Sequence, residues 1–393
     1  MVYFDNAATT PVPKAVADTM YEVLTAHFGN PSSQYPIGVE MKKAVEGWRA
    51  VIAGALGCPA ERLYFTSCGT ESDNWAIQAS LWQNRHRGRH IITTAVEHSA
   101  VLEPCKLLAQ QGYEVTYLKP GRDGNVTAEQ VADALREDTA LVSIMFANNE
   151  IGSIQPIEEI GALCHEKHVL FHTDAVQAAG HVKIDVNAMH IDLLSLSAHK
   201  FHGPKGVGML YARRGIILTN LIEGGAQERG KRGGTENVPG IAAMAAALTE
   251  ACANMDENTK KVTALRNKLI DGISKIPHCA LNGAREPRLP GNVNFCFEGI
   301  EGESLLLLLD AKGISASSGS ACTSGSLDPS HVLLAIGRPH EVAHGSLRLT
   351  ICEDNTEEEI DYILAELPPI VDYLRNMSPV WKDLMSGKRQ FTL

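Results

Sequence analysis

The sequence lacks paired cysteines. It has nine cysteines, an odd number at scattered positions, and no Cys-x-x-Cys occurs. They are Cys58, Cys68, Cys105, Cys164, Cys252, Cys279, Cys296, Cys322 and Cys352. This pattern argues against a disulfide framework and against a structural zinc site, and it predicts a reducing, cytoplasmic setting.

The chain also lacks an excess of positive charge and any long hydrophobic run. Its formal net charge of −11 argues against a nucleic-acid partner held by a broad basic surface. The apolar run 305–309 is too short to span a bilayer, and residues 1–6 have neither a basic region nor an apolar core. We therefore expect no membrane partner and no signal peptide.

Between residues 60 and 215, short apolar runs alternate with amphipathic stretches. The predicted strands are 62–66, 90–94, 113–118, 140–145, 169–172, 191–195 and 206–211, and the predicted helices are 71–83, 100–111, 127–136 and 157–166. This order predicts an α/β fold with a mostly parallel sheet and helices on both faces. In such sheets ligands bind outside the carboxyl ends of the strands, so polar residues there are candidates for function.

Amphipathic helices are also predicted at 11–28 and 39–56, and a long helical stretch at 237–270. Beyond this stretch, strands and helices alternate again, with a strand at 292–297 and a helix at 357–367, which predicts a second, smaller α/β domain completed by the N-terminal segment. A chain of 393 residues is long enough for two domains. We expect a large domain over 15–255, a small domain formed by 1–14 with 256–380, and a tail over 381–393 without an assigned role.

Lys200 lies in the most informative segment, 195–208, among small residues, histidines and glycines. Upstream, a short apolar run leads into Asp174, and Gln177 follows. A buried lysine and an acid at a strand end suit pyridoxal 5′-phosphate (PLP). The lysine binds the cofactor covalently, the acid keeps the pyridine nitrogen protonated, and Gln177 is placed to donate to the ring oxygen. Taken alone, Lys200 would be a surface lysine beside a turn, and Asp174 fits a solvated turn equally well.

Two segments that follow strands offer further contacts to such a cofactor. A helix start with small side chains binds anions, which would place a phosphate on Gly69 and Thr70. Taken alone, Thr70 is more often simply the N-cap of its helix. The ring of His98 suits stacking on a planar cofactor and moving protons near pH 7, although a lone histidine in a turn is more often only satisfied by its neighbours.

Two other positions suit a substrate carboxylate. The sequence Asn148-Asn149-Glu150 follows a strand, and its paired asparagines suit either ligand hydrogen bonds or a turn. Arg348 has apolar neighbours in a predicted strand, where a guanidinium usually needs an anion. That anion is either a ligand carboxylate or an internal salt-bridge partner.

Cys322 lies in a segment of glycine, serine and threonine, 317–326, which has almost no bulk apart from this cysteine. An exposed free thiol oxidises, so such a loop is a poor structural choice. The other cysteines fit the behaviour of small buried hydrophobes. We therefore interpret Cys322 as a nucleophile.

With these residues assembled, the chain resembles a cysteine desulfurase of the fold-type I PLP enzymes, over residues 3–381. The motifs that carry the resemblance are 5–10, 27–33, 66–71, 97–98, 148–150, 172–177, 197–200, 232–236 and 317–326. The resemblance implies a large PLP-binding domain and a small domain that carries the cysteine loop. It also implies a homodimer.

The resemblance assigns a role to each candidate. Lys200 would carry PLP and later move protons, Asp174 would pair with the pyridine nitrogen, and Gln177 with the ring oxygen. His98 would stack on the ring and act as the acid and base. The phosphate would be held by Gly69, Thr70, Ser197 and His199, joined by Thr235 of the partner subunit. Asn149 and Arg348 would hold the substrate carboxylate, and Cys322 would attack the sulfur of L-cysteine, leaving L-alanine and a persulfide.

The same resemblance implies an iron–sulfur scaffold protein as the sulfur acceptor. It implies no resident metal, and for Cys322 at most a transient contact with an iron–sulfur cluster. The variant 325–331 and the ending 374–381 favour the nitrogen-fixation (NifS-like) branch over the housekeeping (IscS-like) branch. Ser99 and Ile151 replace a proline and a threonine that are frequent in the family, and neither change removes a group that the chemistry needs.

Three other functions are compatible with parts of this pattern. A selenocysteine lyase would use the same PLP residues on a different substrate. A PLP-bearing but inactive partner of a scaffold would be expected to lack Lys200 or Cys322, and both are present. A PLP aminotransferase would leave Cys322 without a role.

Overall fold

The computed structural model describes residues 1–319 and 328–393. Its largest sheet has seven strands: β2 (Leu63–Thr66), β3 (His90–Thr94), β4 (Glu114–Leu118), β5 (Thr139–Ser143), β6 (Leu170–Asp174), β7 (Leu193–Ser197) and β8 (Gly208–Ala212). Their order is β2-β8-β7-β6-β5-β3-β4. The pairs from β7 to β4 are parallel, and β8 runs antiparallel to both of its neighbours. The predicted mostly parallel sheet is confirmed.

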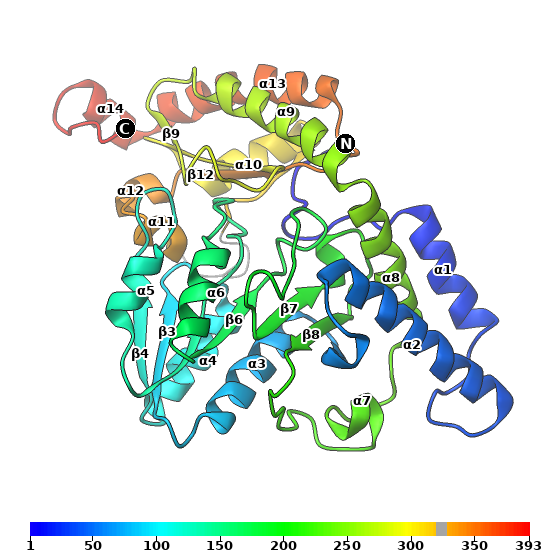
Figure 1. Cartoon of the computed structure of the whole chain (residues 1–393). Coiled ribbons are helices and arrows are strands. Elements are labelled where there is room, and N and C mark those ends of the chain that lie inside the picture. Colours follow the sequence, from blue (N-terminus) through cyan, green and yellow to red (C-terminus); the bar gives the residue numbers. More distant parts are fainter. Residues whose placement is uncertain (320–327) are drawn as a thin grey trace.

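Helices cover both faces of this sheet (Figure 1). One face carries α3 (Gly69–Gln83) and α4 (Ser99–Gln110), and the other carries α2 (Pro36–Leu56), α5 (Ala128–Ala134), α6 (Ile157–Glu166) and α8 (Val238–Ala253). Helix α1 (Lys14–Thr25) packs on α8. Strands β3, β5, β6, β7 and β8 are buried along their whole length, as expected where helices cover both faces.

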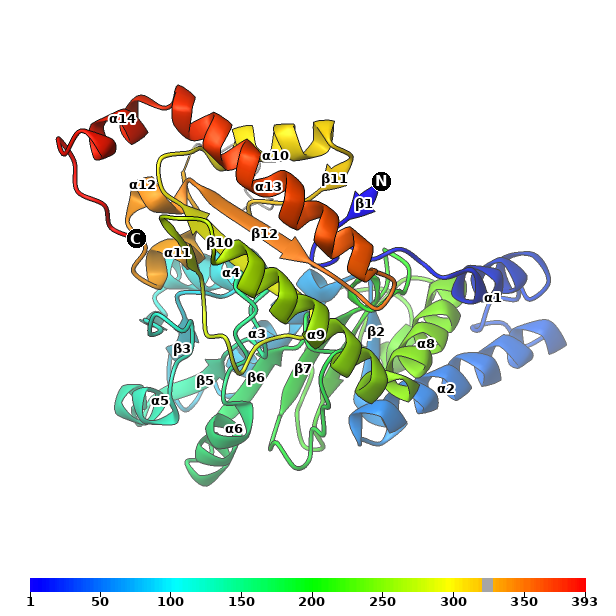
Figure 2. The same ribbon diagram turned by 90° about the horizontal axis from the view of Figure 1, so that it is seen from above.

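A second hydrophobic core lies beside the first (Figure 2). It is built on an antiparallel sheet of β12 (Ser346–Thr350), β10 (Asn292–Phe297) and β9 (Cys279–Leu281), with helices α9 (Met255–Ile273), α10 (Gly302–Ala311) and α13 (Glu357–Met377). The start of the chain joins this core: β1 (Val2–Tyr3) pairs with β11 (Ile314–Ser315), and Phe4 is fully buried in it. The domain boundaries at residues 14 and 255 stay a prediction.

Four shorter helices complete the described chain: α7 (Gln227–Gly230), α11 (His331–Ala335), α12 (His340–Ala343) and α14 (Pro379–Met385). Single 3₁₀ turns span 60–62 and 198–200. The tail after α14 folds back, because the backbone of Thr392 and Leu393 donates to the carboxylate of Glu298.

Two predicted helices differ from the structure. The stretch 237–270 is not one helix, because α8 ends before Asn254 and α9 continues at an angle of 72°. The bend lets α8 pack in the first core and α9 in the second. Helix α13 passes the predicted end at residue 367 and continues through Pro368 and Pro369, with Ile370 and Val371 buried beyond them. The free energy gained by burying this face offsets the loss of the backbone hydrogen bonds that the prolines remove.

Within the described ranges, no single helix is both long enough and apolar enough to cross a membrane. The bent pair α8 and α9 meets that criterion jointly, by length and composition only.

Candidate active site

Ten of the residues predicted from the sequence line one cavity of about 380 Å³, which we call the Lys200 cavity. They are Gly69, Thr70, His98, Asn149, Asp174, Gln177, Ser197, His199, Lys200 and Arg348. They come from the ends of strands of the large sheet, from the turns that follow, and from β12 of the small sheet. A larger cavity of about 670 Å³ between the C-terminal tail and 298–301 contains none of them.

Lys200 ends the turn that follows β7, and the chain start fixes its position. Its Nζ donates to the backbone oxygens of Ala7, at 2.7 Å, and Ala8, at 2.8 Å. Gln177 Nε2 donates to the same Ala7 oxygen, at 3.0 Å. The N-terminal segment therefore brings the amine and the amide to one wall of the cavity.

Asp174 is the last residue of β6 and is only 6% exposed. One of its oxygens accepts from the backbone N–H of Val176, at 2.9 Å. Burial, and then the negative charge of Asp73, raises the pKa of the Asp174 carboxyl to about 7. A carboxylate in this place is costly without a cation beside it.

A buried network lies next to Asp174 and consists of His172, Asp73 and two serines. His172 Nδ1 lies 2.8 Å from Ser143 Oγ, and its Nε2 lies 3.0 Å from Ser195 Oγ and 3.5 Å from Asp73 Oδ1. Burial lowers the pKa of His172 to about 4, so its ring is neutral at pH 7. Burial also raises the pKa of Asp73 to about 7, and its Oδ1 has no hydrogen-bond partner in the part of the chain that the structure describes.

Gly69 and Thr70 open helix α3, whose N-cap is Cys68. The alternative interpretation of Thr70 as the N-cap is therefore wrong, because Thr70 is the second residue of the helix. The N-cap Cys68 makes no side-chain bond to the helix start, which leaves the first N–H groups to other partners. A Cβ added to Gly69 would lie 2.6 Å from Val176 Cγ2, so this approach of helix and turn requires glycine.

Two histidines line the same cavity. His98 is the N-cap of α4, and its Nδ1 accepts from the Ala100 N–H at 3.2 Å, so a neutral ring carries its hydrogen on Nε2. His199 Nδ1 lies 3.2 Å from Thr9 Oγ1. Burial, together with the charges of Lys200 and Lys205, lowers the pKa of His199 to about 4.

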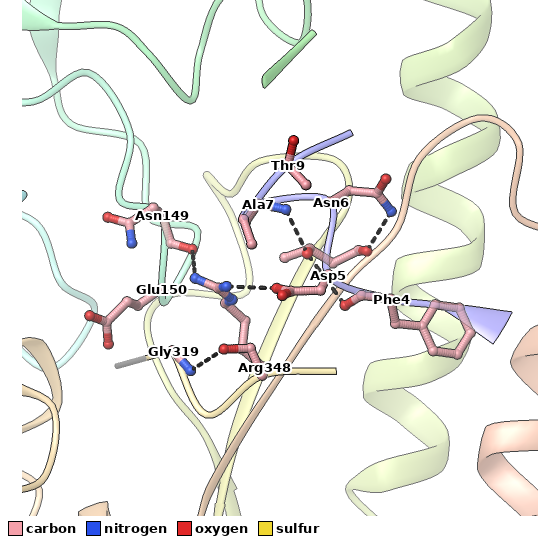
Figure 3. A network of polar contacts seen from close by, with 12 residues as sticks. Phe4, Asp5, Asn6, Ala7, Thr9, Asn149, Glu150, Gly319 and Arg348 are labelled. Carbon is pink, nitrogen blue, oxygen red and sulfur yellow. Dashed lines mark hydrogen bonds and ion pairs between the residues drawn. The ribbon is translucent and has the colours of Figure 1, made fainter. Parts of the chain in front are cut away.

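Arg348 is 3% exposed, lies in β12 and lines the cavity. Figure 3 shows its guanidinium between Asp5 and Asn149. Its Nη2 pairs with Asp5 Oδ1 at 2.7 Å, and its Nη1 donates to the backbone oxygen of Asn149 at 3.2 Å. The internal salt bridge is thus present, and the arginine lines the cavity as well. Its Nε is buried and has no hydrogen-bond partner within residues 1–319 and 328–393, which leaves one donor for an anion.

The sequence left two roles open for the paired asparagines, a turn or hydrogen bonds to a ligand. Asn148 makes the turn, because its side-chain oxygen accepts from the N–H groups of Glu150 and Ile151, each at 2.9 Å. Asn149 lines the cavity.

Thr235 and Cys322 are the predicted site residues that this arrangement does not place. Thr235 is exposed and does not line the cavity of its own chain, although its neighbour Arg232 pairs with Glu71 of α3 at 2.8 Å. Cys322 lies outside the described residues. Gly319, three residues before it, lines the cavity.

Sequence reasoning missed several residues at the site. Asp73 lines the cavity one turn into α3, and Asp5 pairs with Arg348 from the other end of the chain. An acid one turn after an anion-binding helix start was a readable signal for Asp73. Asp5 belonged to a motif of the family resemblance, but its contact spans 343 residues and has no local signature.

The chain matches the family model of the class-V aminotransferases over residues 2–363, and it belongs to this family of PLP enzymes. It is 56% identical over 379 residues to Cysteine desulfurase IscS of Methanosarcina thermophila, covering 96% of this chain and 94% of that protein. It is 53% identical over 392 residues to Cysteine desulfurase IscS of Clostridium botulinum, covering 99% of each. Within the family, the chain thus belongs to the cysteine desulfurases.

Solved structures agree with this assignment. A structure described as a NifS-like protein has a TM-score of 0.89 and 40% identity, covering 95% of this chain and all of that one. A structure described as SspA in complex with cysteine has a TM-score of 0.81 and 35% identity, covering 91% of this chain and 100% of that one. Because relatives of both names match, the preference for the nitrogen-fixation branch stays a prediction.

Proposed function

We propose that this cysteine desulfurase binds L-cysteine in the Lys200 cavity, passes its sulfur to Cys322 and releases L-alanine. The observation that carries the proposal is that one cavity is lined by an amine, an acid and a guanidinium: Lys200, Asp174 and Arg348. The similar chain described in complex with cysteine supports the choice of substrate.

The residues of the cavity fit PLP, the cofactor of the family. The start of α3 at Gly69 and Thr70, with Ser197 and His199, offers donors for a phosphate. The buried carboxyl of Asp174 suits a protonated pyridine nitrogen, with Gln177 near the ring oxygen and Lys200 as the covalent anchor. When bound, PLP makes the substrate Cα–H acidic and accepts electrons from it.

The chain's own residues would do the rest. Arg348, through its unpartnered Nε, and Asn149 hold the substrate carboxylate. The Lys200 amine and the His98 ring move the protons at Cα and at Cβ of the substrate. The Cys322 thiolate attacks the substrate sulfur: an S–S bond forms and the Cβ–S bond breaks. The electron pair of the broken bond stays with Cβ, which takes up a proton, so the products are alanine and a persulfide.

The experiment is to incubate the PLP-loaded enzyme with L-cysteine and a thiol reductant, and to measure alanine and sulfide. Equal amounts of the two products are expected. Pyruvate in place of alanine would contradict the proposal. A larger kcat/KM for L-selenocysteine, with selenide release, would favour the selenocysteine lyase instead.

For partners, we propose a homodimer in which Thr235 of the partner subunit reaches the cofactor phosphate, and an iron–sulfur scaffold protein as the sulfur acceptor. The shared site is supported by the exposure of Thr235 and by the ion pair of the nearby Arg232 with Glu71 of α3. A reducing cytoplasm fits the eight free cysteines of the described residues.

The shared site can be tested with hybrid dimers. A Lys200→Ala chain and a Thr235→Glu chain, each inactive alone, would form one intact site when paired, because the glutamate that repels the phosphate stands only in the other site. Co-expressed hybrids carrying two different tags should regain about half of the wild-type activity per dimer. Inactive hybrids would refute the shared site.

A further inference from the structure

We propose that His202, Cys352 and Glu353 form a binding site for a divalent transition-metal ion of the zinc type, outside the Lys200 cavity. One ligand atom from each residue, an imidazole nitrogen, a thiol sulfur and a carboxylate oxygen, lies within 4.8 Å of the other two. In the part of the chain that the structure describes, this is the one such group of histidine, cysteine and acidic residues.

The orientation of the His202 ring favours a metal ligand. Its Nδ1 lies 2.9 Å from the backbone oxygen of Pro11. A carbonyl only accepts, so Nδ1 carries the hydrogen, and Nε2 of the neutral ring presents a lone pair. Metal-binding histidines are typically fixed in this way, by a hydrogen bond from the other ring nitrogen.

The Nε2 atom of His202 is buried and faces the Glu353 carboxylate. His202 is 6% exposed, and among the described residues its Nε2 has no partner within hydrogen-bond distance. The nearest carboxylate oxygen, on Glu353, lies 3.5 Å away. An ion pair of these two residues alone would leave the neighbouring Cys352 thiol without a role, whereas a metal ion uses all three groups.

The surroundings leave room for an ion and one more ligand. A small cavity of about 30 Å³ is lined by His202, Cys352 and Glu353, and also by His181. Zinc binds nitrogen, sulfur and oxygen ligands at about 2.0–2.3 Å, and sites with three protein ligands keep a fourth position for water. The three residues come from segments 150 positions apart, so Cys-x-x-Cys spacing rules do not detect them.

The position of the site gives it a consequence for the fold. His202 follows the turn that carries Lys200, and Cys352 and Glu353 follow the strand that carries Arg348. A bound ion would therefore join the first core to the second close to the Lys200 cavity. Because it binds only the folded chain, it should raise the thermal unfolding temperature.

Cobalt(II) is the probe for this site, used on the full-length, PLP-loaded enzyme. One equivalent should give a thiolate-to-cobalt charge-transfer band, and ligand-field bands at longer wavelength than the cofactor absorbs. Zinc(II) should displace it. Cys352→Ala and His202→Gln should weaken binding by about 100-fold or more. Retained cofactor absorbance would show that these variants fold.

Cys322→Ala and Cys252→Ala are the matched controls, and both should keep the bands. Loss of the bands in Cys322→Ala, with retention in Cys352→Ala, would place the metal at the catalytic thiol and overturn the proposal. Absence of a stoichiometric thiolate band in the wild type would also overturn it. If Cys352→Ala does not fold, the His202→Gln result decides.

Discussion

At the residue scale, burial controls the acid–base behaviour of the groups around the Lys200 cavity. Asp174, Asp73 and His172 are all nearly inaccessible, and in each case burial favours the neutral form. For Asp174 this preference changes when a cation binds beside it. A cofactor with a protonated ring nitrogen would therefore shift Asp174 towards its ionised form.

Asp174→Asn should retain the cofactor but lose most of the activity. Asparagine is nearly the same size, but it cannot stabilise a positive ring nitrogen, so the electron-accepting power of the cofactor falls. We expect turnover to fall by at least about 100-fold, similar to the loss of a positioned acid or base. Bound cofactor is measured by absorbance and turnover by alanine release. Asp133→Asn, on the exposed face of α5, is the control. Near-wild-type turnover in Asp174→Asn would show that another group pairs with the ring.

Lys200→Ala should abolish both the covalent attachment of the cofactor and turnover, because we assign no other amine to the anchor. Borohydride reduction of the wild type should fix the cofactor on the Lys200 peptide, as read by mass spectrometry. Lys205→Ala removes an exposed lysine five residues on and should keep the covalent cofactor, with the label on the Lys200 peptide. A label on a different lysine would refute the assignment.

The sequence allowed the prediction of residues that follow strands, but not of their long-range partners. Lys200 and Asp174 were recognisable because a lysine among small residues and an acid after an apolar run are local signals. The carbonyls of Ala7 and Ala8, which hold the Lys200 amine, carry no side-chain signal at all. Asp5 became visible only through its contact with Arg348.

At the element scale, the start of helix α3 must approach the turn after β6 closely. Gly69→Ala should weaken PLP binding at least about fivefold, because overpacking at the 2.6 Å contact with Val176 costs about 1–3 kcal/mol. Titration of the cofactor-free protein with PLP measures the effect. Gly47→Ala is the matched control: it lies inside α2 with nothing within 4 Å, and it should stabilise the fold by about 0.4–1 kcal/mol. Equal PLP affinity in both variants would contradict the close approach.

Element boundaries show where local patterns are insufficient. The run of alanines in α8 and the pattern of α9 are both helical, so the sequence predicted one helix. The 72° bend between them depends on which core each helix enters, and that is a tertiary property. The continuation of α13 through two prolines has the same cause.

At the scale of the whole molecule, the Lys200 cavity is lined by residues of both the large and the small sheet, and several acids are buried around it. Burial raises the pKa of Glu97 to about 8, and the pKa values of Asp73, Asp174 and Glu150 to about 7. Their ordinary values lie near 4, so in the folded state they keep protons that the unfolded chain has lost. The contribution of these acids to stability is therefore greatest at low pH and falls as the pH rises towards about 8.

The cofactor-free protein should accordingly lose stability as the pH rises from about 6.5 to about 8. The buried His172 has a lowered pKa and acts in the opposite direction, but only below its unfolded pKa of about 6.5. Thermal unfolding temperatures at several pH values would measure this, and PLP should reduce the loss by pairing with Asp174. A stability that rises over this interval would show that the acids are ionised in the folded state.

The placement of Cys322 is the central claim of the proposed function. Sequence composition alone distinguishes it, because it stands in a glycine, serine and threonine segment almost without bulk. Gly319, the last described residue before it, lines the cavity. The most direct measurement is mass spectrometry of the enzyme after a short exposure to L-cysteine. We expect one added sulfur on the Cys322 peptide, and a Cys322→Ala enzyme that binds PLP normally but neither gains sulfur nor releases alanine. Added sulfur on Cys68 or Cys296, with a fully active Cys322→Ala enzyme, would contradict the account.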